Sequence, residues 1–248
     1  MMSLLNKIKR IKGNILEENF FRPRWYSVFI NPYFINRKSL FNEIGLFAMK
    51  VKKDESVLDV GCGLKPYRSL FKNDDYVGID IKGGGHSDET KIVDKFYDGK
   101  NIPFEDERFN NIICTQVLEH AEDPRKLIEE CSRVIKKDGQ IFISMPFMYP
   151  EHEIPYDYRR FTRFEHQKLL EENNFTSIKI KQTTGFFGTF GQLFSVYIFE
   201  SITFRATILK TLLSVFILGP VQIISLVLDF IFRKSGPTMD YVVTAIKK

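Results

Sequence analysis

The sequence of 248 residues is poor in cysteine and histidine, with three and four respectively, and has a single tryptophan. The cysteines, Cys62, Cys114 and Cys131, are odd in number and lack the spacing of metal ligands. A disulfide-stabilised mini-protein is therefore excluded, and we expect no metal cluster and a reducing, cytoplasmic location. No secretory hydrophobic stretch is expected at the start, because four basic residues interrupt the first 20 positions.

The positive charge is concentrated at the beginning of the sequence. Residues 1–53 hold 11 basic and 3 acidic side chains, a balance of +8, whereas the whole sequence has 36 basic and 31 acidic ones, a formal charge of +5. The rest of the chain is therefore slightly acidic. A basic segment of this kind meets nucleic acid or an anionic membrane surface, and the membrane is favoured only where apolar surface accompanies the charge.

Beyond residue 56, short β-branched runs alternate with stretches of helical period, which is typical of βαβ units in a mostly parallel sheet. A helix is expected from Asp123-Pro124, an N-cap followed by proline, through Ile135, with Gly139 just beyond its end. The expected strands are Ser56–Val60, Tyr76–Asp80, Asn111–Thr115, Gln140–Met145, Ser177–Gln182 and Tyr241–Lys247, with a weaker one at Lys91–Val93.

Residues 185–232 are unusually apolar, with four charged side chains and nine phenylalanines. Within them, residues 211–232 carry only Asp229 as a charge and are long enough to cross a bilayer, although Pro220 is expected to interrupt the run. If the last two expected strands are sheet neighbours, both ends of the segment lie on one side of any membrane. Arg205 and Lys210 between its two arms disfavour two full crossings. We therefore expect a hairpin in the cytoplasmic leaflet; the alternatives are a soluble helical cap or a homodimer face.

A glycine turn follows the first expected strand, in the run Val57-Leu58-Asp59-Val60-Gly61-Cys62-Gly63. Glycines here let the backbone approach a ligand at the carboxyl end of the strand. Pro66 stands where a dinucleotide-binding fingerprint needs its third glycine, which disfavours NAD and FAD. Asp80 ends the second expected strand, 21 residues after Asp59, where a carboxylate can accept both hydroxyl protons of a ribose.

These motifs, together with Y-V-G-I-D, I-P-F-E-D-E-R-F and V-L-E-H, resemble a class I S-adenosylmethionine-dependent methyltransferase over residues 54–182 and the last strand. The resemblance implies a Rossmann-like α/β fold with a seven-stranded sheet, and S-adenosylmethionine as cofactor. It places an acid before the third motif at the adenine; Asp98 is favoured and Asp94 competes for this role. The residues that it implies at the cofactor are Asp59, Gly61, Cys62, Gly63, Asp80, Ile81, Asp98 and Gln116.

The resemblance and the apolar segment together predict four regions. A basic, aromatic-rich helical extension spans residues 1–53, the cofactor-binding core 54–184, an apolar hairpin 185–238, and the last core strand 239–248. The aromatic residues of the extension are expected either to close over the cofactor or to pack on the hairpin. They are Phe20, Phe21, Trp25, Tyr26, Phe29, Tyr33 and Phe34.

Residues after the fourth and fifth strands should face the transferred methyl group. The proline-bounded loop 146–162 resembles the P-x-D-Y-x-R-x-T stretch of methyltransferases associated with bacterial cell-surface glycan assembly. In it, His152 is a candidate base, with Asp157 as its partner or as the base itself. The alternative is that both residues merely hold the loop.

His120 is a third catalytic candidate; otherwise it forms a helix-entry pair with Glu119. Tyr158, Arg159 and Arg160 favour an anionic acceptor, the alternative being a solvated basic turn.

We therefore expect a methyltransferase, peripheral or monotopic on the inner membrane face, that methylates an oxygen of a lipid-linked saccharide or another amphiphilic acceptor. One alternative is methylation of a quinone or another small lipid. Another is a non-catalytic module that binds the cofactor and tethers an assembly to the membrane. A nucleic-acid substrate is disfavoured, because Thr115–His120 lacks an N-P-P-Y-like loop.

Overall fold

A computed structural model describes residues 20–83, 88–201, 207–232 and 236–248. The chain forms two compact units. The helical unit is Met1–Asn42 with Thr184–Met239, and the sheet unit is Glu43–Thr183 with Asp240–Lys248. The basic residues near the start of the sequence and Arg205 lie outside the described residues.

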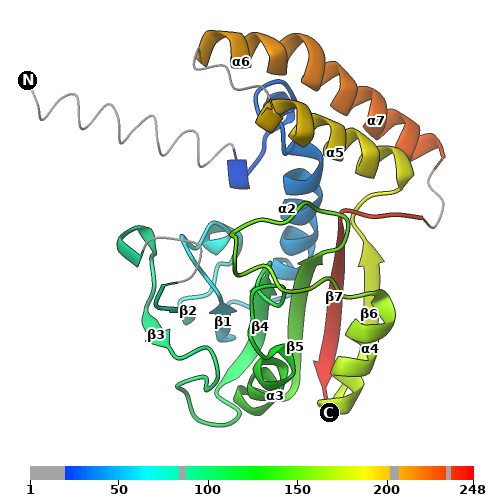
Figure 1. The fold of residues 1–248 in the computed structure, drawn as a ribbon. Helices are drawn as coiled ribbons and strands as arrows, with labels where there is room; N and C mark the ends of the chain where they lie inside the picture. The colour runs from blue at the N-terminus through cyan, green and yellow to red at the C-terminus, as the bar shows by residue number, and fades with distance from the viewer. Residues whose placement is uncertain (1–19, 84–87, 202–206, 233–235) are drawn as a thin grey trace, which may run out of the picture. The chain divides into compact units, whose positions relative to one another are not determined.

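The sheet unit is built on seven strands in the order β3-β2-β1-β4-β5-β7-β6 (Figure 1). Strand β7 runs antiparallel to both of its neighbours, and the other pairs are parallel. The predicted Rossmann-like seven-stranded fold is thereby confirmed, as is the pairing of the last two strands. The strands are β1 (Val57–Val60), β2 (Tyr76–Ile81), β3 (Lys95–Tyr97), β4 (Phe109–Thr115), β5 (Ile135–Pro146), β6 (Phe175–Gln182) and β7 (Asp240–Lys247).

Two local predictions about these elements are wrong. The weak strand expected at Lys91–Val93 begins instead at Lys95, because the backbone N–H of Ile92 donates to the Gly63 carbonyl of the turn after β1 rather than to β2. The helix after Asp123 ends at Val134, and the chain is already extended at Ile135. Gly139 therefore lies inside β5, where a Cβ would come within 2.7 Å of the Asn110 carbonyl oxygen.

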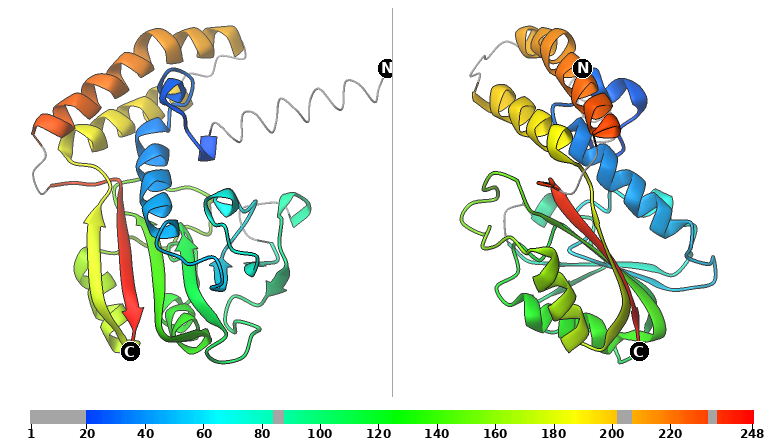
Figure 2. Two further views of the ribbon diagram at one scale, coloured as in Figure 1. Left: turned by 180° about the vertical axis from the view of Figure 1, so that it is seen from behind. Right: turned by 90° about the vertical axis from the view of Figure 1, so that its right-hand side faces the viewer.

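Helices cover both faces of the sheet. Helices α3 (Pro124–Val134) and α4 (Arg163–Glu172) lie on one face, and residues 43–48 of α2 (Phe34–Ala48) lie on the other, where Phe47 packs on Phe142 (Figure 2). The predicted N-cap is confirmed, since the Asp123 side chain accepts a hydrogen bond from the backbone N–H of Lys126. The core between α3 and the sheet is apolar and fully buried.

The helical unit holds α5 (Phe186–Ser201), α6 (Thr207–Leu213) and α7 (Gly219–Ile231), with a 3-10 turn, η1 (Trp25–Phe29), and the start of α2. The prediction that Pro220 interrupts the second apolar arm is wrong. A π-helical turn, η4 (Ser214–Leu218), precedes the proline and lets the helix continue, since the wider turn relieves the clash of a proline ring with the preceding turn. Leu209–Ile231 is the stretch of the described residues that is long and apolar enough to cross a membrane.

The N-terminal segment packs on the hairpin formed by these helices, which is one of the two alternatives that the sequence left open. The Gln222 side chain donates to the carbonyls of Val28 and Asn31, and Gln192 donates to the carbonyl of Pro32. Phe29 lies so close to the start of α7 that a Cβ on Gly219 would come within 2.7 Å of its ring.

Candidate functional site

The order of the strands fixes where a ligand can enter the sheet unit. The chain leaves β1 toward β2 on one side and returns to β4 on the other, so the connections diverge between β1 and β4. In open α/β sheets such a switch point leaves a crevice at the carboxyl ends of the two strands. The loops that begin at Gly61 and Gln116 therefore flank this crevice.

The glycine turn after β1 is tightly packed and conformationally demanding. Gly61 has a φ of +67°, and a Cβ at this position would come within 2.3 Å of Val117 Cγ2. Gly63 has a φ of +48° and its backbone N–H donates to Asp80 Oδ2 at 2.8 Å. Both the left-handed backbone and the close contact with Val117 require glycine at Gly61. The hydrogen bond from Gly63 joins the turn after β1 directly to the end of β2.

Asp80 is the residue that joins the two loops. Its second carboxylate oxygen accepts from the backbone N–H of Ile81 at 2.7 Å, and the Lys91 ammonium lies 3.5 Å away from the same oxygen. Carboxylate oxygens each accept more than one hydrogen bond, so these contacts orient Asp80 without saturating it. The loop and the acid predicted to hold the ribose are thus neighbours in space.

Asp59 is 2% exposed and receives a 2.6 Å hydrogen bond from the Tyr76 hydroxyl. Burial raises the pKa of Asp59 to about 7, against the hydrogen bond from Tyr76 and the positive charge of Lys65. Burial likewise raises the pKa of the Cys62 thiol, and the charge of Asp59 adds to that shift. The Cys62 thiol is therefore protonated and unreactive, whereas the Asp59 carboxyl ionises more readily when a cation approaches it.

The two acids considered for the adenine have different surroundings. Asp94 accepts from the backbone N–H of Gly78 at 2.7 Å and is paired with the Lys65 ammonium. Asp98 lies in the turn after β3 and accepts from the backbone N–H groups of Lys100 and Asn101 at 2.8 and 2.7 Å. The hydrogen bonds from Asn101 and Lys100 lower the pKa of Asp98 to about 2, so it is a fixed anion.

Gln116 follows β4 in a left-handed backbone conformation, with a φ of +57°. Its side-chain amide donates to Ser144 Oγ at 3.1 Å, and its backbone N–H donates to the Ser144 carbonyl at 2.9 Å. These two bonds hold the β4 loop against the end of β5. Gln116 therefore stands at the switch point, across from the glycine turn.

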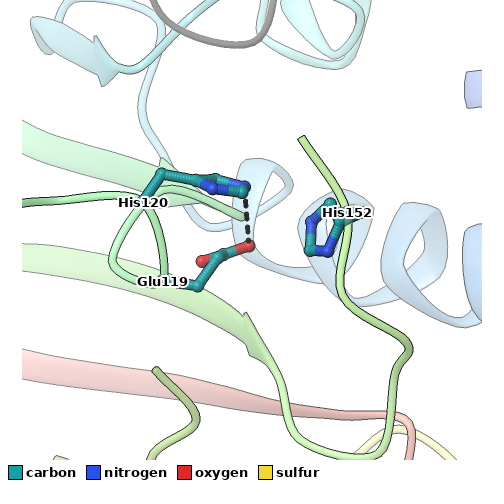
Figure 3. A group of neighbouring side chains, drawn as sticks. All are labelled: Glu119, His120 and His152. Carbon is teal, nitrogen blue, oxygen red and sulfur yellow. Dashed lines mark ion pairs between the residues drawn. The ribbon is translucent and has the colours of Figure 1, made fainter. Parts of the chain in front are cut away.

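The segment after Gln116 is a turn rather than the helix entry that the sequence indicated, since α3 begins only at Pro124. Within this turn Glu119 is fully buried, and His120 Nε2 lies 3.8 Å from Glu119 Oε1 (Figure 3). The loop after β5 brings His152 to the same place, with its ring centroid 4.9 Å from that of His120. The ligating atoms of the three side chains all lie within 4.8 Å of one another.

His152 is supported by the loop that carries it. Asp157 Oδ2 lies 3.0 Å from His152 Nδ1 and also accepts the His152 backbone N–H at 3.0 Å. Arg160 makes a two-pronged contact with the Asp157 carboxylate, in which the Nη2–Oδ2 distance is 2.7 Å. Arg159 donates to the carbonyls of Ala121 and Glu122. Both guanidinium groups thus bind this chain's own atoms, whereas Tyr158 is exposed.

The electrostatics of this group follow from burial. Burial raises the pKa of Glu119 well above its usual range, and the charge of Asp240 adds to the effect. Burial also lowers the pKa of His152, although Asp157 opposes this. Burial would raise the pKa of Asp157, but the Arg160 guanidinium and the His152 N–H hold it at about 2.

Sequence reasoning did not select three residues that the fold brings into this region. Lys91 links Asp80 to the loop after β2, and Tyr76 contacts Asp59. Glu119 was noted only as a neighbour of His120, and adjacency in the sequence carries no sign of its burial. Lys91 and Tyr76 each contact an acid at least 11 residues away, and the burial of Glu119 depends on tertiary packing. No local sequence pattern indicates any of these roles.

A family model described as a methyltransferase domain matches residues 33–181. An uncharacterized protein of Methanocaldococcus jannaschii is 31% identical over 143 residues, which are 51% of this chain and 67% of that protein. The ubiquinone biosynthesis O-methyltransferase of Pasteurella multocida is 34% identical over 110 residues, 36% of this chain and 46% of that enzyme. The match thus spans less than half of that relative.

Solved structures share the fold at low sequence identity. Phosphoethanolamine N-methyltransferase 2 of Haemonchus contortus, in complex with S-adenosyl-L-methionine, has a TM-score of 0.53 and 16% identity, and the alignment covers 83% of this chain and 52% of that one. A SAM-dependent methyltransferase of Thermotoga maritima also has a TM-score of 0.53, with 13% identity, covering 87% and 93% of the two chains.

Proposed function

Since this chain belongs to the methyltransferase-domain family, we propose that it is an enzyme that transfers a methyl group from S-adenosylmethionine to a hydroxyl oxygen of an amphiphilic acceptor at a membrane surface. The observation that carries the proposal is the junction at the switch point, where Gly63 donates its N–H to Asp80 beside the β4 loop. This junction offers bare backbone and an oriented carboxylate in one crevice, which suits a nucleoside with a ribose.

S-adenosylmethionine is the cofactor. In our proposal the glycine turn lies beneath its methionine and ribose parts, and Asp80 accepts the ribose hydroxyls. Buried Asp59 faces the positive end of the molecule, where an approaching cation favours its charged form. The remaining contacts in the proposal come from Cys62, Ile81, Asp98 and Gln116.

The acceptor side of the proposal is formed by the loops after β4 and β5. His120, His152 and Asp157 meet there, and none of them lies in the glycine turn. The sulfonium is a strong electrophile, so the protein needs chiefly to hold an acceptor oxygen in line and to promote loss of its proton. We assign these two tasks to the three residues.

Membrane contact is proposed from the unusual burial pattern of α7. The buried side of this helix consists of small and polar residues, Gly219, Gln222, Ser225 and Asp229. Its exposed side is apolar, and Phe230 is 87% exposed. Soluble helices show the opposite arrangement, with apolar residues inside. The pattern is that of a helix whose outer surroundings are lipid.

The packing between α5 and α7 supports the same proposal. A Cβ on Gly191 would come within 2.0 Å of Ser225 Oγ, and one on Gly188 within 2.7 Å of Asp229 Oδ2. The Gly185 backbone N–H donates to Asp229 at 2.7 Å. Close approach over small residues, with polar contacts between helices, is how helices associate in membranes. Because β6 and β7 are neighbours, the hairpin enters and leaves on one side.

We favour a lipid-linked saccharide as the acceptor, because the loop 146–162 resembles a stretch of methyltransferases associated with bacterial cell-surface glycan assembly. A quinone-like phenol is the second candidate, and the similarity to ubiquinone O-methyltransferases favours it. Arg159 and Arg160 were the reason to expect an anionic acceptor, but both bind atoms of their own loop region, which leaves Tyr158 as the exposed member of that group. The shared chemistry of the two candidates is a hydroxyl on an amphiphile.

The experiment is transfer of radiolabelled methyl from S-adenosylmethionine to a lipid extract and, in parallel, to soluble metabolites of the source cells. Label in the organic phase is expected, and alkaline or mild-acid hydrolysis then separates saccharide-linked from quinone-like products. Label only in the aqueous phase would contradict the amphiphilic acceptor and make the hairpin a cap or a homodimer face. Cofactor binding without any label would favour the non-catalytic tether.

Variants of the residues on the acceptor side test their role in turnover separately from cofactor binding. His152→Ala and Asp157→Asn are expected to lower turnover by about tenfold or more while leaving S-adenosylmethionine affinity unchanged, since general acid–base or positioning groups contribute at least this much. Glu122→Gln, an exposed carboxylate beside the same loop, is the control. Unchanged turnover in both variants would remove these residues from the reaction.

A further inference from the structure

The Glu119 carboxyl group is the unusual feature of the site. Its side chain is fully buried, and neither carboxylate oxygen accepts a hydrogen bond from another residue in the described part of the chain. The nearby guanidinium of Arg160 is engaged by Asp157. A buried carboxylate without a partner is costly, so natural proteins place one where a cation or a proton donor joins it.

His120 points a lone pair at this carboxylate. Its Nδ1 lies 3.0 Å from the carbonyl oxygen of Tyr156, and a carbonyl can only accept, so Nδ1 carries the proton. The opposite nitrogen, Nε2, is then the unprotonated one in the neutral ring. It lies 3.8 Å from Glu119 Oε1, on the side that faces the cluster (Figure 3).

His152 is arranged in the same way by different atoms. Its Nδ1 lies 3.0 Å from Asp157 Oδ2 and 3.4 Å from the Pro150 carbonyl oxygen, and both are acceptors. The proton of the neutral ring is therefore on Nδ1, which leaves Nε2 with its lone pair. A histidine that gives its second N–H to a carboxylate or a carbonyl is the usual form of a metal-binding histidine.

We propose that Glu119, His120 and His152 bind one divalent transition-metal cation. Two imidazoles and one carboxylate suit zinc, manganese, iron or cobalt better than magnesium, which prefers oxygen ligands. Three protein ligands leave coordination positions for further oxygens, as in catalytic rather than structural sites. The ligating atoms all lie within 4.8 Å of one another, and the three side chains draw together when they share an ion.

The role of the ion rests on the proposed function. The ion binds the acceptor's hydroxyl oxygen and lowers the pKa of that hydroxyl, and the released proton passes to water. The oxygen then attacks the methyl carbon of the sulfonium. The new C–O bond forms as the C–S bond breaks, the electron pair of that bond stays on sulfur, and the products are a methyl ether and a neutral thioether.

The test measures metal binding directly. The full chain, treated with EDTA and dialysed, is titrated with Co²⁺ while the visible absorption of the bound ion is followed. Saturation at one equivalent is expected. Glu119→Gln, His120→Ala and His152→Ala should each weaken Co²⁺ binding by about tenfold or more. Glu122→Gln, an exposed carboxylate three residues from Glu119, should bind as the unaltered chain does.

A second measurement on the same samples keeps the proposal separate from folding and from the enzymatic function. S-adenosylmethionine affinity reports that each variant is folded, because the ligands lie outside the glycine turn. Cofactor binding without saturable Co²⁺ binding would overturn the metal site and leave the methyltransferase proposal standing. Saturable Co²⁺ binding that the three variants lose supports the site even where no methyl transfer is found.

Discussion

At the scale of single residues, Asp59 ties stability to pH. Its carboxyl keeps its proton to about pH 7 in the folded chain, whereas the ordinary value is 3.8. Between these two values the folded state binds more protons than the unfolded state. Stability from this group is therefore greatest below about pH 4 and falls as the pH rises to about 7.

The variant Asp59→Asn is expected to remove this dependence, because the amide does not titrate and still accepts the Tyr76 hydroxyl bond. The unfolding free energy of the variant relative to the unaltered chain should rise by roughly 3 to 4 kcal/mol between pH 4 and pH 8. Urea unfolding at several pH values measures it. Parallel pH profiles for the two proteins would show that Asp59 is ionised in the folded chain.

Gly61 should be the least replaceable residue of the glycine turn. Alanine there meets both a left-handed backbone and Val117 at 2.3 Å, so the turn has to move. We expect Gly61→Ala to weaken S-adenosylmethionine binding by about tenfold or more, as measured by calorimetry.

The matched control is Gly83→Ala. Gly83 has a φ of +75°, but a Cβ at this position meets nothing within 4 Å. It therefore carries the backbone strain without the clash, outside the turn. Equal losses of affinity in the two variants would mean that strain alone, and not the contact with Val117, determines the effect.

At the scale of elements, substitutions on the two sides of α7 should have opposite effects on membrane binding and on stability. Phe216 on η4 and Phe230 on α7 are both largely exposed. Phe216→Ser and Phe230→Ser should each lower partition into phospholipid vesicles by about tenfold or more, since burying one phenylalanine contributes roughly 2 kcal/mol. The thermal midpoint in detergent should stay within a few degrees, because neither ring belongs to the core.

The buried side of α7 should respond in the reverse manner. Gln222→Leu removes two buried hydrogen bonds, to the carbonyls of Val28 and Asn31 in the N-terminal segment, at a cost of about 1–3 kcal/mol. The thermal midpoint should fall while vesicle binding changes little. If instead the phenylalanine variants destabilise the protein and bind vesicles normally, the exposed side is a protein contact.

At the scale of the whole molecule, the chain should float with neutral phospholipid vesicles in a density gradient, because apolar side chains rather than charges supply most of the proposed contact. Raising the salt concentration should leave a large part of the binding in place. A chain that stays at the bottom of the gradient and elutes as a dimer would favour the homodimer face.

The sequence by itself determined the elements whose signals are local. The alternation of apolar runs indicated the sheet, Asp123-Pro124 indicated the start of α3, and the spacing of Gly61, Gly63 and Asp80 indicated a cofactor loop. These signals are readable because strand period, helix caps and glycine turns each arise from neighbouring residues. The end of α3 was misplaced, since a helix that runs straight into a strand needs no glycine cap.

Only the tertiary structure decided what depends on packing between distant segments. His120 and His152 meet because β4 and β5 are adjacent and their loops leave the same edge of the sheet. The side of α7 that is buried was equally hidden, because Gln222, Ser225 and Asp229 form a polar stripe at helical spacing, which in a soluble helix faces the solvent, whereas here packing places it inside. Contacts of this kind arise from the register of the sheet and from burial, which no single stretch of the sequence records.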